Sequence, residues 1–196
     1  MPPPAHEILP VTPDRWSELQ ELFGPSGAYS NCWCTWWRQT GSDFSRGCER
    51  RGEGNRALMA ALVAAGDEPG LIAYRDGRPV GWVSVAPRPQ FGRVLRSPTL
   101  RPAPAQADDT TTWSIVCFWM PRAERGHGLA TALLDAAVAH AAARGAHAVE
   151  AYPVDTAGAR QASANLFTGT LGMFRRAGFR EVERGRGQQA IVRRQV

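Results

Sequence analysis

An apolar strand that runs through two glycines into a long helix limits what this chain can fold into more than any other feature. Residues 113–120, WSIVCFWM, are apolar on both faces of an extended chain, which is typical of a central strand covered on each side. Residues 124–131, ERGHGLAT, follow, and from Leu129 apolar residues recur at helical spacing as far as Gly145. Another strand, AVEAYPV, occupies residues 148–154. A strand, helix, strand unit of this kind requires a sheet with helices packed on it.

Further strands and helices alternate along the rest of the chain. We predict a short strand at 7–11, a helix at 12–24 that Thr12 and Pro13 begin, and a second helix at 54–66. Two strands flank Asp76 and Gly77, a dipeptide favoured in tight hairpins. A short helix at 168–178 and a final strand or hairpin close the chain. The fold class is therefore α/β (α+β), a mixed sheet covered by helices.

Length and composition favour one domain over residues 1–196, with two small domains as the alternative. A chain of 196 residues with 43% hydrophobic content can bury a core of its own. It has no apolar run long enough to span a membrane, and MPPPAHEILPV lacks the pattern of an export signal, so we expect a cytoplasmic protein and no membrane partner. Residues 96–112, rich in proline and alanine, are predicted to form an exposed loop.

Four cysteines are too few to suggest a disulfide framework. Cys32 and Cys34 form a CxC pair, but no second pair with zinc-like spacing accompanies them. We therefore expect free thiols packed in an aromatic neighbourhood and no metal site.

The net charge of +5 comes from arginines that are scattered along the chain. Scattered arginine can serve an anionic ligand, a nucleic-acid contact or plain solubility, and solvated surface is the default interpretation. Nucleic acid is not the expected partner, although a tRNA substrate stays open.

Gly126 and Gly128 stand where a helix begins, and this position favours an anion site. The first amides of a helix lack partners and the helix dipole is positive there, while glycine lets a phosphate approach the backbone. A P-loop would need a GK[ST] ending, which is missing, and a dinucleotide fingerprint would need a small residue where Thr131 stands, although Glu150 lies about as far along as that fingerprint's acidic residue. A tight turn without any ligand is the remaining alternative.

The pattern of Arg125, Gly128 and Ala130 resembles the acetyl-CoA-binding segment of the GNAT superfamily of N-acetyltransferases. The preceding strand, the following helix and strand, and a short helix that ends in AGF extend this resemblance over nearly the whole chain. It implies a GNAT-like, mostly antiparallel central sheet flanked by helices, with acetyl-CoA as co-substrate. In similar proteins the pyrophosphate lies on backbone amides and the pantetheine arm bonds to the preceding strand. The corresponding residues here are Arg125, Gly126, His127, Gly128, Leu129 and Ala130 for the pyrophosphate, and Phe118, Trp119 and Met120 for pantetheine.

Acetyl transfer to an amine needs a neutral nucleophile, donors for the oxyanion and a proton for the leaving thiolate. Many relatives carry a tyrosine four residues before the glycine of the closing GF, where this chain has Phe174. The proton donor is then absent, unless Tyr152, Thr168 or Thr170 replaces it. Glu150 shares a strand face with Tyr152 and is the predicted general base, with a solvated or ion-paired carboxylate as the alternative.

The acceptor pocket of similar proteins is formed by their early helices, which corresponds here to the CWCTWWR segment. Trp33, Trp36 and Trp37 could present flat faces to an acceptor that Asn31 and Arg38 orient, and core packing is the competing explanation. The predicted function is N-acetyl transfer to a small-molecule primary amine by a monomer or homodimer. The alternatives are an aminoacyl-tRNA or protein amino terminus as substrate, and a non-catalytic CoA-binding module.

Overall fold

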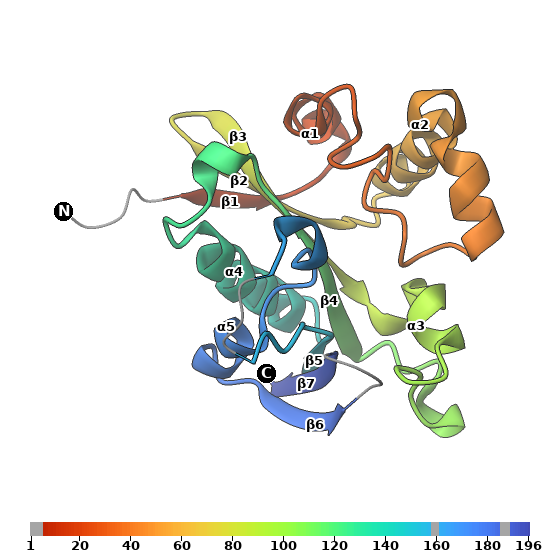
Figure 1. Ribbon diagram of the computed structural model, residues 1–196, viewed down its shortest axis with the longest axis vertical. Coiled ribbons are helices and arrows are strands. Elements are labelled where there is room, and N and C mark those ends of the chain that lie inside the picture. Colours follow the sequence, from red (N-terminus) through yellow and green to blue (C-terminus); the bar gives the residue numbers. More distant parts are fainter. Residues whose placement is uncertain (1–5, 158–160, 185–188) are drawn as a thin grey trace.

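The computed structural model describes residues 6–157, 161–184 and 189–196 (Figure 1). In these residues seven strands form one sheet, in the order β1-β2-β3-β4-β5-β7-β6. All neighbouring strands are antiparallel except β4 and β5, which are parallel. The strands are β1 (Glu7–Pro10), β2 (Gly70–Arg75), β3 (Arg78–Pro87), β4 (Thr112–Trp119), β5 (Ala148–Ala151), β6 (Arg180–Arg184) and β7 (Ala190–Gln195). The prediction of a mixed, mostly antiparallel sheet is confirmed.

Helices cover both faces of this sheet, and each face has its own apolar cluster. Helices α4 (Leu129–Ala143) and α5 (Leu171–Arg176) lie on one face, and α1 (Trp16–Phe23), α2 (Gly41–Ala64) and α3 (Gly92–Arg96) lie over the other. Short 3-10 turns occupy Pro13–Arg15, Arg88–Gln90, Pro104–Gln106, Arg122–Glu124 and Ser163–Asn165. No helix in the described ranges combines the length and the apolar character needed to cross a membrane.

The structure confirms the helix α4 and the β2–β3 hairpin that were predicted from local sequence patterns. The apolar stripe of α4, from Leu129 to Ala141, is buried against the sheet, and Gly145 follows the helix with φ 82°. Asp76 and Gly77 both have positive φ, 52° and 74°, as a tight hairpin turn requires. At Gly81 an added Cβ would lie 3.0 Å from Leu129 and 3.1 Å from Leu133, so this glycine lets α4 pack closely on β3.

Helix α2 differs from its prediction, because it begins at Gly41 rather than near residue 54. The side chain of Thr40 caps it by accepting a hydrogen bond from the Asp43 amide at 3.2 Å. The helix is then interrupted at residues 49–52, where Arg50, Arg51 and Gly52 have left-handed φ values of 47°, 60° and 81°. We call residues 49–52 the elbow. It divides α2 into two helical arms.

The loop at residues 96–112 is mostly exposed, as predicted, but it is tied to the sheet at two points. Leu100 is buried in the core, and the Gln106 carbonyl accepts a hydrogen bond from the Arg88 guanidinium at 2.6 Å. The four cysteines are free thiols, which confirms that prediction, and Sγ of Cys34 lies 3.4 Å from Sγ of Cys117. No group of three or more His, Cys, Asp and Glu side chains in the described chain could hold a metal ion.

Candidate active site

The loop between β4 and α4 presents free backbone amides at a helix N-terminus. Gly126 and Gly128 have φ values of 85° and 82°, and an added Cβ at either would meet nothing within 4 Å. Their conformation, and not crowding, is therefore what requires glycine. In the described structure the amides of residues 126–130 have no hydrogen-bond partner, because Gly128 caps α4 without a side-chain acceptor. Free amides at the positive end of a 15-residue helix suit a phosphate.

Arg125 differs from the five residues after it, because its hydrogen-bonding groups are already used. Its amide donates to the Arg122 carbonyl at 3.3 Å, and its guanidinium donates to the Met120 carbonyl at 3.1 and 3.3 Å. The Arg125 side chain thus fastens the loop to the end of β4. Arg125 therefore acts on the anion site indirectly, by holding the loop that carries the free amides.

A gap opens between β4 and β5 next to this loop. The two strands pair only as far as Ile115 and Ala151, and the pairing of β4 with β3 shifts by one residue between Val85 and Ser84. Beyond the gap the Phe118 amide donates to the Phe167 carbonyl at 2.6 Å. The segment that includes Phe167 also bonds to the end of β5, since the Val154 amide donates to the Gly169 carbonyl at 3.0 Å. Residues 167–169 therefore bridge the two diverging strands.

Glu150 lies at the centre of a buried polar network. Its carboxylate, on a residue only 4% exposed, accepts from Arg88 Nη1 at 3.1 Å and from Arg193 Nε at 3.0 Å. The Tyr152 hydroxyl donates to the same carboxylate at 3.4 Å and lies 3.0 Å from Ser114 Oγ. Burial, followed by the charge of Glu150, raises the pKa of the Tyr152 phenol far above its usual value. Tyr152 therefore stays protonated at neutral pH and serves as a donor.

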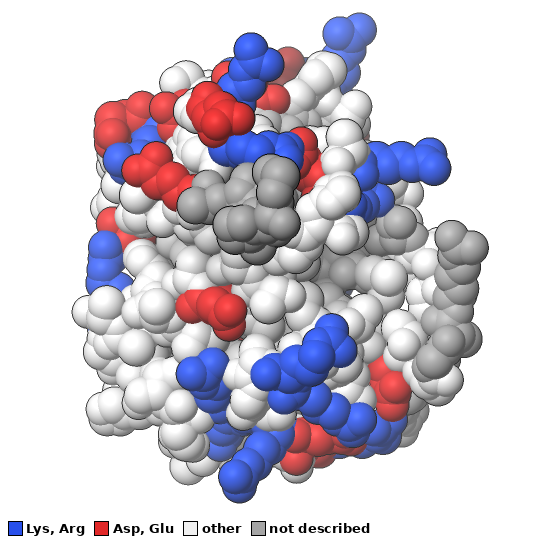
Figure 2. Space-filling model, turned by 90° about the vertical axis from the view of Figure 1, so that its left-hand side faces the viewer, with Lys and Arg blue, Asp and Glu red and all other residues white. Residues whose placement is uncertain are grey.

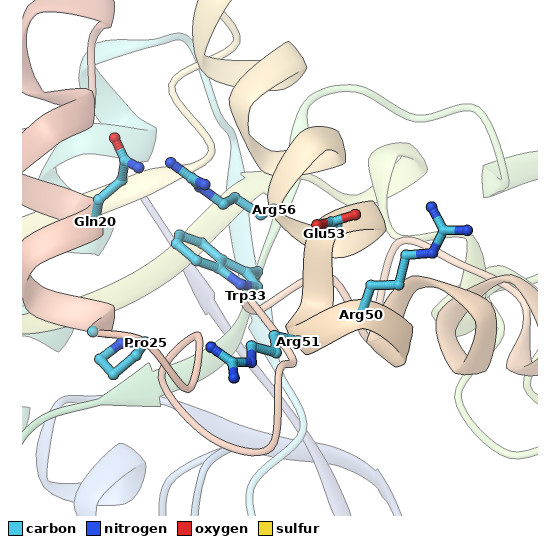
Figure 3. A pocket seen from close by; sticks show the side chains of 8 residues that line it. Gln20, Pro25, Trp33, Arg50, Arg51, Glu53 and Arg56 are labelled. Atoms are coloured by element: carbon cyan, nitrogen blue, oxygen red, sulfur yellow. The ribbon is translucent and has the colours of Figure 1, made fainter.

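A pocket of about 370 Å³ lies between α1 and the elbow of α2 (Figure 3). We call it the elbow pocket. Trp33 forms one wall, and its indole ring is 5.8 Å from the guanidinium carbon of Arg56. The other lining residues are Gln20, Gly24, Pro25, Arg50, Arg51 and Glu53.

Comparison with known proteins identifies the family. The family model described as "Acetyltransferase (GNAT) family" matches residues 31–173, well over half of the chain. This chain belongs to the GNAT family of acetyltransferases. It is therefore an acyltransferase that takes its acyl group from acetyl-CoA.

Solved structures agree with this GNAT fold over nearly the whole chain. The PaiA N-acetyltransferase of Thermoplasma acidophilum, in complex with coenzyme A, has a TM-score of 0.54 at 13% identity, covering 98% of this chain and 99% of its own. The ribosomal-protein-alanine N-acetyltransferase of Brucella melitensis has a TM-score of 0.53 at 18% identity, covering 97% and 99%. A diaminobutyrate acetyltransferase of Paenibacillus lautus, with its substrate L-2,4-diaminobutyric acid and coenzyme A, has a TM-score of 0.50 at 14% identity, covering 97% and 94%. No curated protein matches in sequence.

The strand that the GNAT resemblance assigns to pantetheine divides its side chains between the two faces of the sheet. Phe118 and Met120 point into the apolar cluster under α4, whereas the Trp119 ring packs 5.9 Å from Phe23 of α1. The Phe118 amide already donates a hydrogen bond to the Phe167 carbonyl. A pantetheine arm that pairs with Phe118 N–H must displace that bond, and one that pairs with the Met120 amide need not.

The residues that could replace the missing GNAT tyrosine differ in how they are used. Phe174 is fully buried, with its ring 5.0 Å from Phe179 and 6.2 Å from Phe118. The Thr170 hydroxyl caps α5 by accepting from the Met173 amide at 3.3 Å. The Thr168 hydroxyl, on a residue 2% exposed, has no partner in the described chain. The Tyr152 hydroxyl donates to Glu150, so among these candidates the Thr168 hydroxyl alone has no partner in the described residues.

The CWCTWWR segment does not present its tryptophans to a common pocket. Only Trp33 lines the elbow pocket. Trp37 is 6% exposed and its ring covers that of Tyr152 at 5.9 Å, while the guanidinium carbon of Arg93 lies 3.5 Å from the centroid of the Trp36 ring. Arg38 donates to Gln90 Oε1 at 2.8 Å, and burial lowers its pKa to about 10.

Asn31 holds the elbow in place. Its side-chain Nδ2 donates to the Cys48 carbonyl at 3.3 Å, and its backbone carbonyl accepts from Nδ2 of the Asn55 side chain at 3.0 Å. Gly52 fits against it so closely that an added Cβ would lie 2.8 Å from the Cβ of Asn31. Asn31 therefore positions the two arms of α2 and, with them, the pocket arginines.

Two groups of site residues were missed by sequence reasoning. Arg88 and Arg193 reach Glu150 from 62 and 43 positions away, and no local pattern indicates such a pairing. Arg51 lies in a stretch for which no helix was predicted, and Arg56 lies in the predicted helix at 54–66, but neither arginine was assigned to the site. The run Thr40 to Asp43 matches a helix cap and was the available signal that a helix begins there.

Proposed function

We propose that the acceptor is the primary amine of a small molecule, acetylated by acetyl-CoA. The observation that carries this proposal is the elbow pocket, whose volume of about 370 Å³ falls in the range of small-molecule sites, roughly 300–1,000 Å³. Its aromatic wall, Trp33, and its polar lining fit a compact polar ligand. Two structural neighbours are named for amine substrates, a ribosomal protein's alanine and diaminobutyric acid. These names support acetyl transfer to an amine and do not indicate which amine this chain acetylates.

In this proposal the coenzyme lies across the loop and the gap. Its pyrophosphate binds the amides of Gly126, His127, Gly128, Leu129 and Ala130, and Arg125 supports the loop through Met120. Its pantetheine arm follows the strand at Phe118, Trp119 and Met120. The amine attacks the thioester carbonyl, a C–N bond forms as the C–S bond breaks, the amine loses a proton and the thiolate takes one up.

In this proposal Tyr152 takes part in proton transfer, and Glu150 positions it through their hydrogen bond. Tyr152 is the hydrogen-bond donor, because its raised pKa keeps the phenol protonated. Glu150 can act as a base only when one of its oxygens is released from Arg88 or Arg193, since all its described contacts are donors. In this proposal Trp33 is the wall of the acceptor pocket, Asn31 holds the elbow beside it, and Trp37 covers the Tyr152 ring.

The test is incubation of the full chain with acetyl-CoA and a panel of amines, with release of free CoA thiol as the signal. The panel contains small amines, peptides with free amino termini and aminoacyl-tRNA. Saturable thiol release with a small amine supports the proposal. Release only with peptides or aminoacyl-tRNA overturns it, and calorimetric binding of CoA without release on any amine would leave a CoA-binding module.

A further inference from the structure

The elbow pocket carries more positive charge than its described acidic lining balances. Three arginines line it against one acid, Glu53, which leaves a charge of +2. Arg50, Arg51 and Arg56 make no hydrogen bond or ion pair to any described residue. Most exposed arginines need no partner, but here Arg51 and Arg56 lie on either side of a concave space with an aromatic wall. Such a site attracts an anion.

The backbone of the elbow is strained where it carries these side chains. Arg50 and Arg51 are successive non-glycine residues with φ values of 47° and 60°. The left-handed conformation is unfavourable for a residue that carries a Cβ. Strain of this kind persists only where surrounding contacts enforce it, and it is frequent at ligand sites. Gly52 and Asn31 supply those contacts, so the fold holds the two arginines at a fixed place on the pocket rim.

Two of the three arginines are turned toward Trp33. Figure 3 shows the side chains of Arg51 and Arg56 on either side of the indole, with Gln20 and Pro25 opposite, whereas Arg50 extends away from them. Gly27, with φ 55°, lies against the indole edge and leaves no room for a Cβ, so the ring is held from behind. An anionic group between Arg51 and Arg56 would place its attached carbon frame beside the exposed part of Trp33.

The pocket wall is linked to the strand that carries the thioester. Trp33 precedes Cys34, whose Sγ contacts Sγ of Cys117 in β4 at 3.4 Å, and Cys117 precedes Phe118. A ligand anchored in the pocket therefore lies on the α1 and α2 side of that strand.

We propose that the elbow pocket binds the anionic group of the acceptor, a carboxylate or a phosphate, through Arg51 and Arg56. The acceptor is then an amine that also carries a negative charge. This inference rests on the proposed function, because it assumes a small-molecule acceptor. Trp33 sets the position of the apolar part, and the arginines select the charged end.

Binding is tested without turnover, by calorimetry of the full chain with probes that have no free amine. N-acetyl-L-phenylalanine and phenyl phosphate carry the charge, and N-acetyl-L-phenylalaninamide is the neutral match. We expect the charged probes to bind at least about tenfold more tightly, and the Arg51→Gln/Arg56→Gln double variant to lose that difference, since hydrogen bonds to charged groups contribute this much. The affinities of N-acetyl-L-phenylalanine and phenyl phosphate, compared with each other, show whether a carboxylate or a phosphate is preferred.

The matched control is Arg46→Gln, an exposed arginine on the same helix that pairs with Asp43 outside the pocket. It removes the same charge and should keep the preference for charged probes. Equal binding of charged and neutral probes, binding of none of them, or an equal loss in the Arg46 variant overturns the proposal.

Turnover separates this inference from the function on which it rests. Thiol release is compared for L-phenylalanine and phenethylamine, which differ by the carboxylate. We expect kcat/KM to favour phenylalanine at least about tenfold, with the double variant raising KM and leaving kcat unchanged. Thiol release without this preference overturns the anion site and leaves the proposed function. Charge-dependent binding without thiol release on any amine overturns the proposed function instead.

Discussion

At the scale of single residues, Glu150 is the side chain whose role the structure changes most. Both of its oxygens accept from guanidinium groups, and Arg88 is itself 1% exposed. Breaking a buried pair by removing one partner leaves an unpaired charge, which typically costs about 3–5 kcal/mol. Glu150 therefore contributes mainly to the stability of the fold, and any role in catalysis comes in addition to this.

We therefore expect Glu150→Gln to lower the free energy of unfolding by about 3 kcal/mol, because Arg88 loses its hydrogen-bonded carboxylate and keeps only Asp109, at 3.8 Å, as a counter-charge. Urea unfolding measures this loss. The residual activity of the folded variant should keep the acidic limb of its pH profile, as befits a positioning residue. A variant of unchanged stability whose acidic limb disappears would show that Glu150 is the general base after all.

His140 on α4 makes folding stability depend on pH. Burial lowers its pKa, the charge of Arg144 lowers it further, and Glu68 opposes both. The unfolded histidine takes up its proton near pH 6.5, above the folded value, so between the two the unfolded chain binds more protons. Stability contributed by neutral His140 is present above that window and is lost as the pH falls through it.

We expect the wild-type chain to lose stability on going from pH 7.5 to about pH 5.5, and His140→Gln to lose less. Urea unfolding at both pH values measures the difference. His147→Gln removes a histidine from the exposed surface and serves as the control, which should follow the wild type. An acid dependence that is identical in wild type and His140→Gln contradicts this assignment.

At the scale of elements, helix α4 allows a matched test of the coenzyme loop. Gly128 precedes the helix and Gly145 follows it, both have φ 82°, and neither crowds a neighbour within 4 Å. Alanine at either position should cost roughly 1 kcal/mol of stability through backbone strain alone. Only Gly128→Ala should also weaken CoA binding, because only that glycine belongs to the loop of free amides.

Thermal unfolding and calorimetry with CoA measure the two effects separately. We expect similar stability losses and a CoA affinity that falls at least severalfold in Gly128→Ala alone. Equal CoA affinities in both variants would contradict the placement of the pyrophosphate.

The elements that sequence predicted correctly are those whose signals are local. The stripe from Leu129 to Ala141 and the turn at Asp76 and Gly77 depend on neighbours a few residues away. The elbow was not predicted because it depends on Asn31, which reaches Cys48 from 17 positions earlier. Glycines among arginines and glutamates carry no sign of such a contact. The same holds for the site. The glycine loop before α4 was predicted because its signal lies in adjacent residues, whereas Arg88 and Arg193, the partners of Glu150, are distant in sequence and were not predicted.

At the scale of the whole molecule, charge bears on the choice between acceptors. The chain carries +5, and Figure 2 shows acidic and basic side chains mixed in the upper and lower parts of the face it presents. Nucleic-acid partners are bound by many phosphate contacts at once, which requires cations gathered in a groove or stripe. The pocket arginines Arg51 and Arg56 instead form one compact positive site.

The salt dependence of turnover distinguishes these two arrangements. Between 50 and 200 mM salt, a partner held by six or more phosphate contacts loses about 1,000-fold or more in affinity, because bound counterions are released. An acceptor held by Arg51 and Arg56 should lose less than about fivefold in kcat/KM over the same range, since only one or two exposed contacts are screened. Thiol-release kinetics at several salt concentrations measure the slope, with the Arg51→Gln/Arg56→Gln variant as reference. A loss of 100-fold or more in the wild type, retained in that variant, would place the acceptor on a wide phosphate-binding surface and would contradict a small-molecule acceptor held in the pocket.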